Sequence, residues 1–370
     1  MRLTLLSPDF RTGGAERAVA IMANHWCAQG HQVTILTMDD GSFSSLFSLA
    51  PGIRHHALGI FFPSSGLISS LRNEWTRLRR IRARILKSRP DAVVSVIDSV
   101  NIRTIMATRF TGLPVLVSER TDPAHHDIGP FWSLARNLTY PLADAVITQT
   151  ETAKNHFRRA IRNKTLVIPN PVVAPGMNTS PYRESKNIVC LTRLSPEKDP
   201  FTMLKAFARI AHQHPEWTLT FVGDGSEADT LMAETMRQNL QARVIFAGWQ
   251  RNVGRWLRCG AIIALSSRYE GFPNALCEGL AHGLPAVATA TTGAASVVRP
   301  GVDGLLVEVG DDEAFAKALA RLIEDADLRQ TMGARAAEIL DRFGVDRVMG
   351  SWNTHLSHLI AKRRGHAPAE

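Results

Sequence analysis

The chain has 370 residues, 45% of them apolar, which is enough for two domains of ordinary size. It lacks the run of roughly 18 apolar residues that a membrane-spanning helix needs, and its four cysteines lie apart without CxxC spacing, which argues against a zinc site and for reduced thiols in a cytoplasmic protein. The first 170 residues hold 21 Lys and Arg against 12 Asp and Glu, whereas the remaining 200 hold 22 of each. A basic amino-terminal half predicts an anionic partner: a phosphorylated substrate, a membrane surface or a nucleic acid.

Short apolar runs alternate with helical patterns along the first half. Most are continuous rather than alternating in polarity, which is typical of parallel strands covered on both faces. The predicted strands are Leu3–Leu6, Val33–Thr37, Ala92–Ile97, Val115–Ser118, Ala145–Thr148 and Leu166–Ile168. The pattern predicts βαβ units and an open, doubly wound α/β sheet, whose ligands bind beyond the carboxyl ends of the strands.

Two glycines, Gly13 and Gly14, follow the first strand just before a helix. Paired glycines let a backbone approach a ligand closely. The pair is not a GxGxxG motif, so by itself it is explained more simply as a structural turn.

A basic amphipathic helix is predicted over Leu71–Pro90. Eight Lys and Arg surround a stripe of apolar side chains, which are Leu71, Trp75, Leu78, Ile81 and Ile85. Packing of the stripe on the sheet explains part of this pattern, and attachment to anionic lipid is a second explanation. A nucleic-acid role is disfavoured because aromatic residues are not interleaved with the basic ones.

A polar run follows the predicted strand Val115–Ser118. Its candidates for contact with a sugar or an acceptor are Arg120, Asp122, His125 and His126. The two adjacent histidines could also hold a metal ion, but neighbouring side chains diverge, which disfavours that reading.

The segment 171–185 is rich in Pro and Gly and is interpreted as a linker between domains. A second α/β domain follows, with helices dominating after Asp311. Its predicted strands are Ile188–Leu191, Leu219–Val222, Val244–Phe246, Ala261–Leu265, Ala286–Ala288 and Leu305–Val307.

Arg193 and Lys198 lie five residues apart in the loop after the strand Ile188–Leu191. An arginine fork and a lysine point charge could converge there on one anion, such as the diphosphate of a leaving group. The simpler explanation is a solvated loop in which both cations pair with Glu197 and Asp199.

The stretch from Glu270 to Glu278 is the most informative of the chain. A strand runs into a loop with Glu270, and a helix that starts near Asn274, after Pro273, carries Glu278. The amide groups and dipole at a helix start favour an anion. One acid on either side of an anion site fits a nucleotide sugar.

The ordered set of motifs resembles the retaining GT-B glycosyltransferases of family 4, also called glycosyltransferase group 1, over nearly the whole chain. The motifs are Gly13–Arg17, Arg193 with Lys198, Val222–Gly225, the E-x7-E element from Glu270 to Glu278, Gly283–Pro285 and Gly301–Val307. One departure is Thr192, since a glycine usually precedes that arginine.

The resemblance implies roles for these residues. Glu270 would contact the donor hexose and Glu278 the ribose hydroxyls, while Arg193 and Lys198 take the diphosphate, so that the catalytic residues are Arg193, Lys198 and Glu270. Gly14 would approach the diphosphate from the other domain. The turn formed by Gly271, Phe272, Pro273 and Asn274 would set backbone amides around the sugar and diphosphate.

The resemblance also implies two Rossmann-like domains that face a cleft, at 1–170 and 186–345, with a helix at 346–370 that crosses back onto the first. The expected reaction moves a hexosyl or N-acetylhexosaminyl group from a UDP-sugar to a lipid-linked saccharide in cell-surface polysaccharide synthesis. It would proceed with retention and without a cofactor or metal, at the inner face of the cell membrane. The alternatives are an enzyme like the UDP-sugar 2-epimerases and a non-catalytic module that binds anionic surfaces.

Overall fold

The computed structural model describes residues 1–10, 13–42, 47–61, 67–176 and 185–365, and the chain divides into two units. Unit 1 comprises Met1–Pro171 and Val345–Glu370, and unit 2 comprises Val172–Gly344. Part of the expected linker, residues 177–184, lies outside the described residues.

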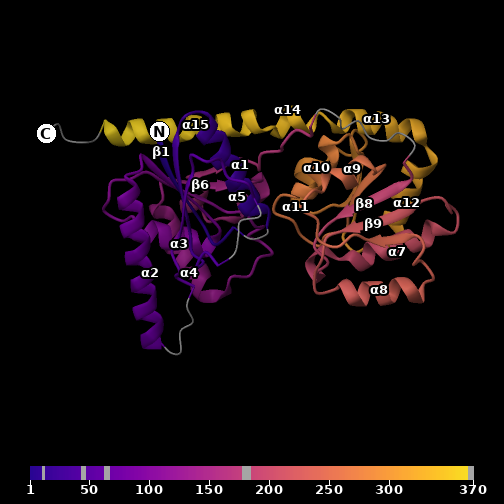
Figure 1. The fold of residues 1–370 in the computed structure, drawn as a ribbon, viewed down its shortest axis with the longest axis horizontal. Helices are drawn as coiled ribbons and strands as arrows, with labels where there is room; N and C mark the ends of the chain where they lie inside the picture. The colour runs from indigo at the N-terminus through magenta and orange to yellow at the C-terminus, as the bar shows by residue number, and fades with distance from the viewer. Residues whose placement is uncertain (11–12, 43–46, 62–66, 177–184, 366–370) are drawn as a thin grey trace. The chain divides into compact units, whose positions relative to one another are not determined.

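The described part of unit 1 forms a seven-stranded parallel sheet of order β3-β2-β1-β4-β5-β6-β7 (Figure 1). Its strands are β1 (Arg2–Ser7), β2 (Gln32–Thr37), β3 (Arg54–Ala57), β4 (Ala92–Val96), β5 (Val115–Ser118), β6 (Ala145–Thr148) and β7 (Thr165–Val167). The sequence did not predict β3, because this edge strand, Arg-His-His-Ala, is polar and mostly exposed. The strands that were predicted for this half are confirmed within a residue or two at each end.

The helices of unit 1 cover both faces of that sheet. They are α1 (Gly14–Ala28), α2 (Leu67–Ser88), α3 (Asp98–Ala107), α4 (Gly129–Thr139), α5 (Glu151–His156), α6 (Arg159–Arg162) and α15 (Val345–Arg364), with a 3-10 turn, η1 (Tyr140–Leu142). Strand order reverses at β1, so right-handed crossovers place α1 on one face and α2, α3 and α4 on the other. The last three pack side by side.

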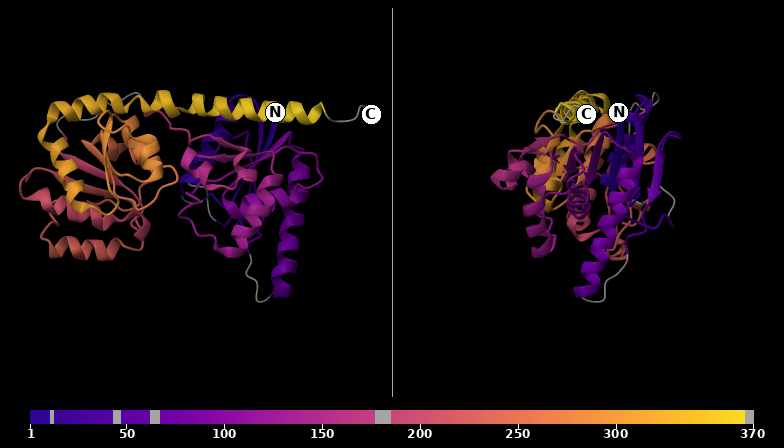
Figure 2. Two further views of the ribbon diagram at one scale, coloured as in Figure 1. Left: turned by 180° about the vertical axis from the view of Figure 1, so that it is seen from behind. Right: turned by 90° about the vertical axis from the view of Figure 1, so that its left-hand side faces the viewer.

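Helix α2 is the predicted basic helix, but only part of its apolar stripe is buried. Ile81 and Ile85 are in the core, whereas Leu71 and Trp75 are 74% and 60% exposed. The reason is visible in Figures 1 and 2, where the amino-terminal turns of α2 extend beyond the other elements of unit 1.

Helix α15, drawn in yellow in Figures 1 and 2, completes unit 1 by packing on α1. The rings of Trp26 and Trp352 meet edge to face with their centroids 6.2 Å apart, and both side chains are fully buried. The Trp26 Nε1–H donates to Asn353 Oδ1 at 2.7 Å.

The described part of unit 2 forms a six-stranded parallel sheet of order β10-β9-β8-β11-β12-β13. Its strands are β8 (Asn187–Leu191), β9 (Thr218–Val222), β10 (Val244–Phe246), β11 (Ile262–Leu265), β12 (Ala286–Thr289) and β13 (Gly304–Val307). These match all six predicted strands. Both faces carry buried apolar clusters, as continuous apolar strands require.

The helices of unit 2 include the carboxyl-terminal helical run that the sequence predicts after Asp311. They are α7 (Pro200–Ala211), α8 (Ala228–Arg237), α9 (Gly254–Arg258), α10 (Asn274–Ala281), α11 (Thr292–Val297), α12 (Asp312–Glu324), α13 (Ala326–Ala336) and α14 (Ile339–Phe343), with a 3-10 turn, η2 (Pro196–Lys198). The side chains of Asp311 and Asp325 accept hydrogen bonds at the starts of α12 and α13.

Candidate functional site

The strand order of unit 2 reverses between β8 and β11, which are neighbours in the sheet. Ligands of open α/β sheets bind at such a reversal, beyond the carboxyl ends of the strands. The loop after β8 carries Arg193 and Lys198, and the loop after β11 carries Glu270. Topology therefore brings the predicted catalytic residues of this unit to one place.

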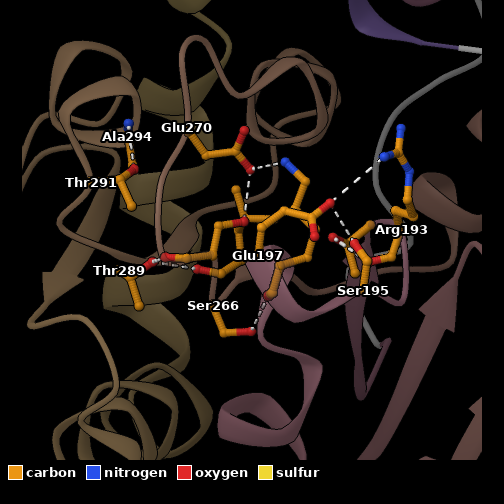
Figure 3. Close-up of polar contacts among 12 residues, drawn as sticks. Arg193, Ser195, Glu197, Ser266, Glu270, Thr289, Thr291 and Ala294 are labelled. Carbon is orange, nitrogen blue, oxygen red and sulfur yellow. Dashed lines mark hydrogen bonds and ion pairs between the residues drawn. The ribbon is translucent and has the colours of Figure 1, made fainter. Parts of the chain in front are cut away.

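Lys198 and Glu270 are in direct contact. The Lys198 Nζ lies 2.8 Å from Glu270 Oε1, and the Ser267 hydroxyl donates to the same oxygen at 2.7 Å. The Glu270 side chain is 10% exposed and that of Lys198 is 23% exposed. Figure 3 shows both dashed lines at Glu270 ending on one carboxylate oxygen.

Backbone and side-chain contacts tie the two loops together. The Ser266 hydroxyl donates to the Asp199 carbonyl at 2.7 Å, and the Arg268 N–H donates to the Glu197 carbonyl at 2.9 Å. The Arg268 Nε also lies 3.2 Å from the Asp199 carboxylate. These contacts fix the position of Lys198, which lies between Glu197 and Asp199 in the chain.

Asp199 has a left-handed backbone, with φ 45° and ψ 57°, and its carboxylate caps α7 by accepting from Thr202. Aspartate is among the residues that tolerate this conformation because its short side chain bonds locally. The turn ends η2 at Lys198 and starts α7 at Pro200.

Arg193 lies on the outer side of this arrangement. Its side chain is 61% exposed and its guanidinium is 3.6 Å from Glu197, which also accepts a 2.6 Å hydrogen bond from Ser195 (Figure 3). Burial raises the pKa of Glu197, but the Ser195 hydrogen bond and the Arg193 charge outweigh it and leave the pKa below its ordinary value. The simpler explanation from the sequence, in which both cations pair with acids of their own loop, thus holds for Arg193, which pairs with Glu197. Lys198 instead pairs with Glu270.

Two glycines after β9 support the loop that carries Arg193. A Cβ on Gly223 would lie 1.9 Å from the Thr192 carbonyl oxygen, and one on Gly225 would lie 2.2 Å from that of Leu194. The backbone at both glycines therefore packs directly on the backbone of the loop that carries Arg193. Any other residue at either position would have to displace that loop.

A third loop, after β12, packs against Glu270, and the sequence reasoning missed it. A Cβ on Gly293 would lie 2.7 Å from the Glu270 carbonyl oxygen, and the Thr292 hydroxyl donates to the same oxygen at 3.4 Å. The Thr289 hydroxyl donates to the Ser267 carbonyl, as Figure 3 shows. The run Thr291-Thr292-Gly293, at the carboxyl end of a strand next to β11, was the signal that could have found it.

Helix α10 begins at Asn274, as predicted, with Pro273 at its N-cap. The Phe272 side chain is part of the core and packs on Phe343 with ring centroids 5.6 Å apart, so only its backbone is a candidate for ligand contact. The Asn274 N–H donates to the Phe272 carbonyl at 3.0 Å and is used inside the turn. Gly271 and Glu278 are half-buried.

Unit 1 has its own strand reversal, between β1 and β4. Gly14 is the first residue of α1 after β1, and Asp98 starts α3 after β4. Ile97, which precedes Asp98, has a φ of 71°. This backbone is strained for a β-branched residue, and strain of this kind concentrates at functional sites.

A group of charged residues, of which Glu119, Asp98 and Arg136 are buried, lies beside this reversal. Glu119 follows β5, is 2% exposed, accepts a 2.8 Å hydrogen bond from the Tyr140 hydroxyl and lies 3.8 Å from Arg136. Burial and the negative charge of Asp98 raise the pKa of Glu119 to about 7. Asp98 in turn lies 3.2 Å from His126 Nε2, and this contact raises the pKa of His126.

His126 was predicted from the sequence as a site residue, whereas Asp98 and Glu119 were not. Glu119 directly follows β5 and Asp98 lies two residues after the end of the neighbouring strand β4, and that shared position was the available signal.

The other predicted contacts of this run have partners within unit 1. The Arg120 guanidinium contacts Asn170 Oδ1 and lies 3.4 Å from the Met22 sulfur, and burial lowers the pKa of Arg120 to about 10. Asp122 accepts from the Ala124 N–H and lies 3.0 Å from His125 Nδ1. The two histidine rings therefore diverge, as expected, to Asp122 and Asp98.

Neither a metal site nor a membrane span emerges from the described residues. Within them, no three His, Cys, Asp or Glu side chains gather in a way that could hold an ion. None of the helices there combines the length and the hydropathy needed to cross a bilayer.

Comparison with protein families gives two matches that together cover most of the chain. The model described as glycosyl transferases group 1 matches residues 178–339. The model described as glycosyltransferase family 4 matches residues 12–174.

Two curated relatives match over nearly the full length of both chains. The chain is 25% identical to the GalNAc-alpha-(1->4)-GalNAc-alpha-(1->3)-diNAcBac-PP-undecaprenol alpha-1,4-N-acetyl-D-galactosaminyltransferase of Campylobacter jejuni, over 95% of this chain and 97% of that protein. It is 23% identical to the amylovoran biosynthesis glycosyltransferase AmsD of Erwinia amylovora, over 96% and 99%.

Solved structures share the fold. HepE of Anabaena, in complex with UDP and glucose, gives a TM-score of 0.80 at 22% identity over 96% of this chain and 99% of that one. Sucrose-phosphate synthase of Thermosynechococcus elongatus gives 0.83 at 19% identity over 98% and 99%.

Proposed function

Because the chain belongs to the GT-B glycosyltransferases of family 4, or group 1, we propose that it transfers a hexosyl or N-acetylhexosaminyl group from a UDP-sugar to a lipid-linked saccharide. The transfer retains the anomeric configuration and needs no metal ion or other cofactor. The observation that carries the proposal is the contact of Lys198 with Glu270 at the strand reversal of unit 2.

The charge arrangement suits a donor that carries a diphosphate. An ammonium group has three N–H donors, of which one points to Glu270 Oε1. The others can bind phosphate oxygens and offset the negative charge that grows as the glycosyl bond breaks. Arg193, exposed and paired with Glu197 at the surface, can join as a second cation.

Glu270 suits the sugar side of the donor. Its Oε1 accepts from Lys198 and Ser267, which leaves Oε2 to accept from a sugar hydroxyl. Lys198 and Ser267 hold this carboxylate in place from one side, so we assign to Glu270 the role of orienting the sugar rather than that of an acid. The proton of the attacking hydroxyl then goes to the leaving diphosphate on the same face of the sugar.

Relatives support the choice of donor and acceptor. The Anabaena structure contains UDP, and the name of the Campylobacter relative specifies a saccharide on undecaprenyl diphosphate. For the acceptor we propose unit 1, in which Asp98 and His126 offer a carboxylate and an imidazole beside the strand reversal.

A lipid-linked acceptor also requires access to a membrane surface, and we assign that contact to unit 1 at the cytoplasmic face. Trp75 on α2 is exposed, with the Arg79 guanidinium 4.5 Å from its ring centroid. Helix α4 exposes a second apolar stripe, consisting of Phe131, Leu134 and Leu138. Cations beside exposed apolar side chains suit anionic lipid headgroups.

The donor is tested by incubating purified protein with UDP-sugars and GDP-sugars and measuring nucleotide release and thermal shift. The wild type should release UDP from one UDP-sugar, and faster when a polyprenyl-diphosphate saccharide is added. Glu270→Gln should be strongly impaired, whereas Glu313→Gln, an exposed glutamate of the same unit, should not. Equal rates in all three proteins would refute the role of Glu270, and no UDP release by any of them would favour a non-catalytic module.

Two further readouts test the finer claims. The anomeric configuration of the product, measured by NMR, tests retention, and an epimerised sugar formed from UDP-sugar alone would indicate an epimerase instead. Trp75→Ala should weaken sedimentation with anionic vesicles, while Trp249→Ala, an exposed tryptophan of unit 2, should not.

A further inference from the structure

A cavity of unit 1 lies at the edge of its sheet opposite to the predicted site. Its volume is about 620 Å³, within the range of small-molecule sites. Asp144 and Lys164, which line it, directly precede β6 and β7. These are the amino ends of parallel strands, whereas Gly14, Asp98 and Glu119 follow the carboxyl ends.

Helix α15 supplies the opposite wall with one face. His355, His358 and Lys362 lie three and four residues apart, which aligns them along the helix, and Arg363 lies next to them. With Lys164, the lining holds three permanent cations and two imidazoles against one carboxylate, that of Asp144.

Contacts inside the unit hold two of these cations in place. The Lys164 Nζ donates to the carbonyls of Pro141 and Ala143, at 2.7 and 3.0 Å. The Arg363 Nη2 donates to Asp144 Oδ1 at 2.8 Å, while Asp144 Oδ2 accepts from the Val115 N–H at 2.9 Å. Both oxygens of the one acid are thus already engaged, and the cavity keeps an excess of positive charge.

An apolar surface adjoins the cations. A smaller cavity of about 220 Å³ shares Asp144 and Arg363 and is lined also by Phe110 and Leu142. Phe110 is 94% exposed and has a φ of 61°, a conformation that bulky residues rarely adopt. A bound apolar group would remove this ring from water, which is favourable in proportion to the apolar area buried.

We propose that this cavity binds a phosphate group, with Lys164, Lys362, His355 and His358 as its donors. The adjoining apolar surface accommodates a chain attached to that phosphate, as in an anionic phospholipid, and a free phosphate ester supplies the same headgroup chemistry. The inference does not depend on the proposed transfer reaction, because none of these residues follows the carboxyl end of a strand.

The test compares wild type with Lys362→Glu, which reverses an exposed charge in the cavity, and with Arg347→Glu, a matched reversal on the same helix outside it. Binding of inorganic phosphate is measured by calorimetry. Binding to phosphatidylcholine vesicles, with and without phosphatidylglycerol, is measured by sedimentation. We expect Lys362→Glu to weaken either phosphate binding or vesicle binding by about tenfold or more, since hydrogen bonds to charged groups are strong. Arg347→Glu should leave both near wild type.

The outcomes identify the source of the phosphate. A loss confined to the vesicles with phosphatidylglycerol indicates a lipid headgroup, and a loss of inorganic phosphate binding indicates a soluble ester. Phosphate held near Lys198 and vesicles held by α2 would respond equally in both variants. Equal binding by Lys362→Glu and Arg347→Glu in every assay would therefore overturn the proposal, as would no binding by the wild type.

Discussion

Replacing Lys198 by alanine should separate catalysis from folding. The change removes the ammonium group 2.8 Å from Glu270 and leaves that buried carboxylate with Ser267 as its one remaining hydrogen-bond donor among the contacts described above. A buried polar group that loses its hydrogen-bond partner typically costs about 1–3 kcal/mol of stability. Loss of one preorganised group that stabilises transition-state charge costs about 10²–10³ in kcat.

A double variant distinguishes the two contributions. In Lys198→Ala with Glu270→Gln the unpaired charge is gone, and the amide oxygen still accepts from Ser267. Stability should therefore recover toward wild type, while UDP release stays at least as slow as in Glu270→Gln alone. Lys317→Ala is the matched control, because it breaks an exposed pair with Glu313 in the same unit and should change neither quantity.

The assays are thermal unfolding and the initial rate of UDP release at saturating donor. Near wild-type transfer by Lys198→Ala would remove this lysine from the mechanism. Recovery of both stability and rate in the double variant would show that the lysine acts only by neutralising Glu270.

Four other tests address separate parts of the structure and of the mechanism. Gly293→Ala places a Cβ against the Glu270 carbonyl, so kcat should fall several-fold or more with a smaller change in KM, and an unchanged rate would contradict the packing described. The pKa of Glu119 is raised in the folded state, so its contribution to stability is full at low pH and is lost as the pH rises through about 7. This loss of stability is worth up to ~3 kcal/mol. Glu119→Gln should reduce the loss, which is measured as the free energy of unfolding from pH 5 to 8. Transfer should survive excess EDTA, and a rate restored only by added Mg²⁺ or Mn²⁺ would contradict the metal-free mechanism. Trp352→Ala should cost about 3–5 kcal/mol by leaving Trp26 against a void, which calorimetry would detect as earlier unfolding.

Much of the fold could be read from the sequence because buried parallel strands are continuous apolar runs. That signal found all of the strands of unit 2, and it failed at β3, whose exposed edge position carries no apolar pattern. The apolar stripe of α2 could be seen in the sequence. The sequence does not show how far the sheet extends beneath that helix, so the exposure of Trp75 was not predictable.

The candidate site was predictable where a motif marked it. Arg193, Lys198 and Glu270 each lie in a recognisable turn, yet their pairing depends on which strands are neighbours. Strand order is a long-range property: only once β8 lies beside β11 does Lys198 meet Glu270 rather than Asp199. The same limit hid Asp98, whose role depends on β4 and β5 being adjacent.

The packing of Trp26 on α15 has a consequence for synthesis of the chain. Trp26 donates its hydrogen bond to a residue 327 positions later, and at bacterial-type rates of about 5–20 residues per second this partner emerges roughly 15–65 s after it. Unit 2 is continuous in sequence and can fold as it leaves the ribosome, whereas unit 1 must wait with the α1 surface uncovered. Nascent unit 1 is therefore the part of this protein that we expect to need a chaperone.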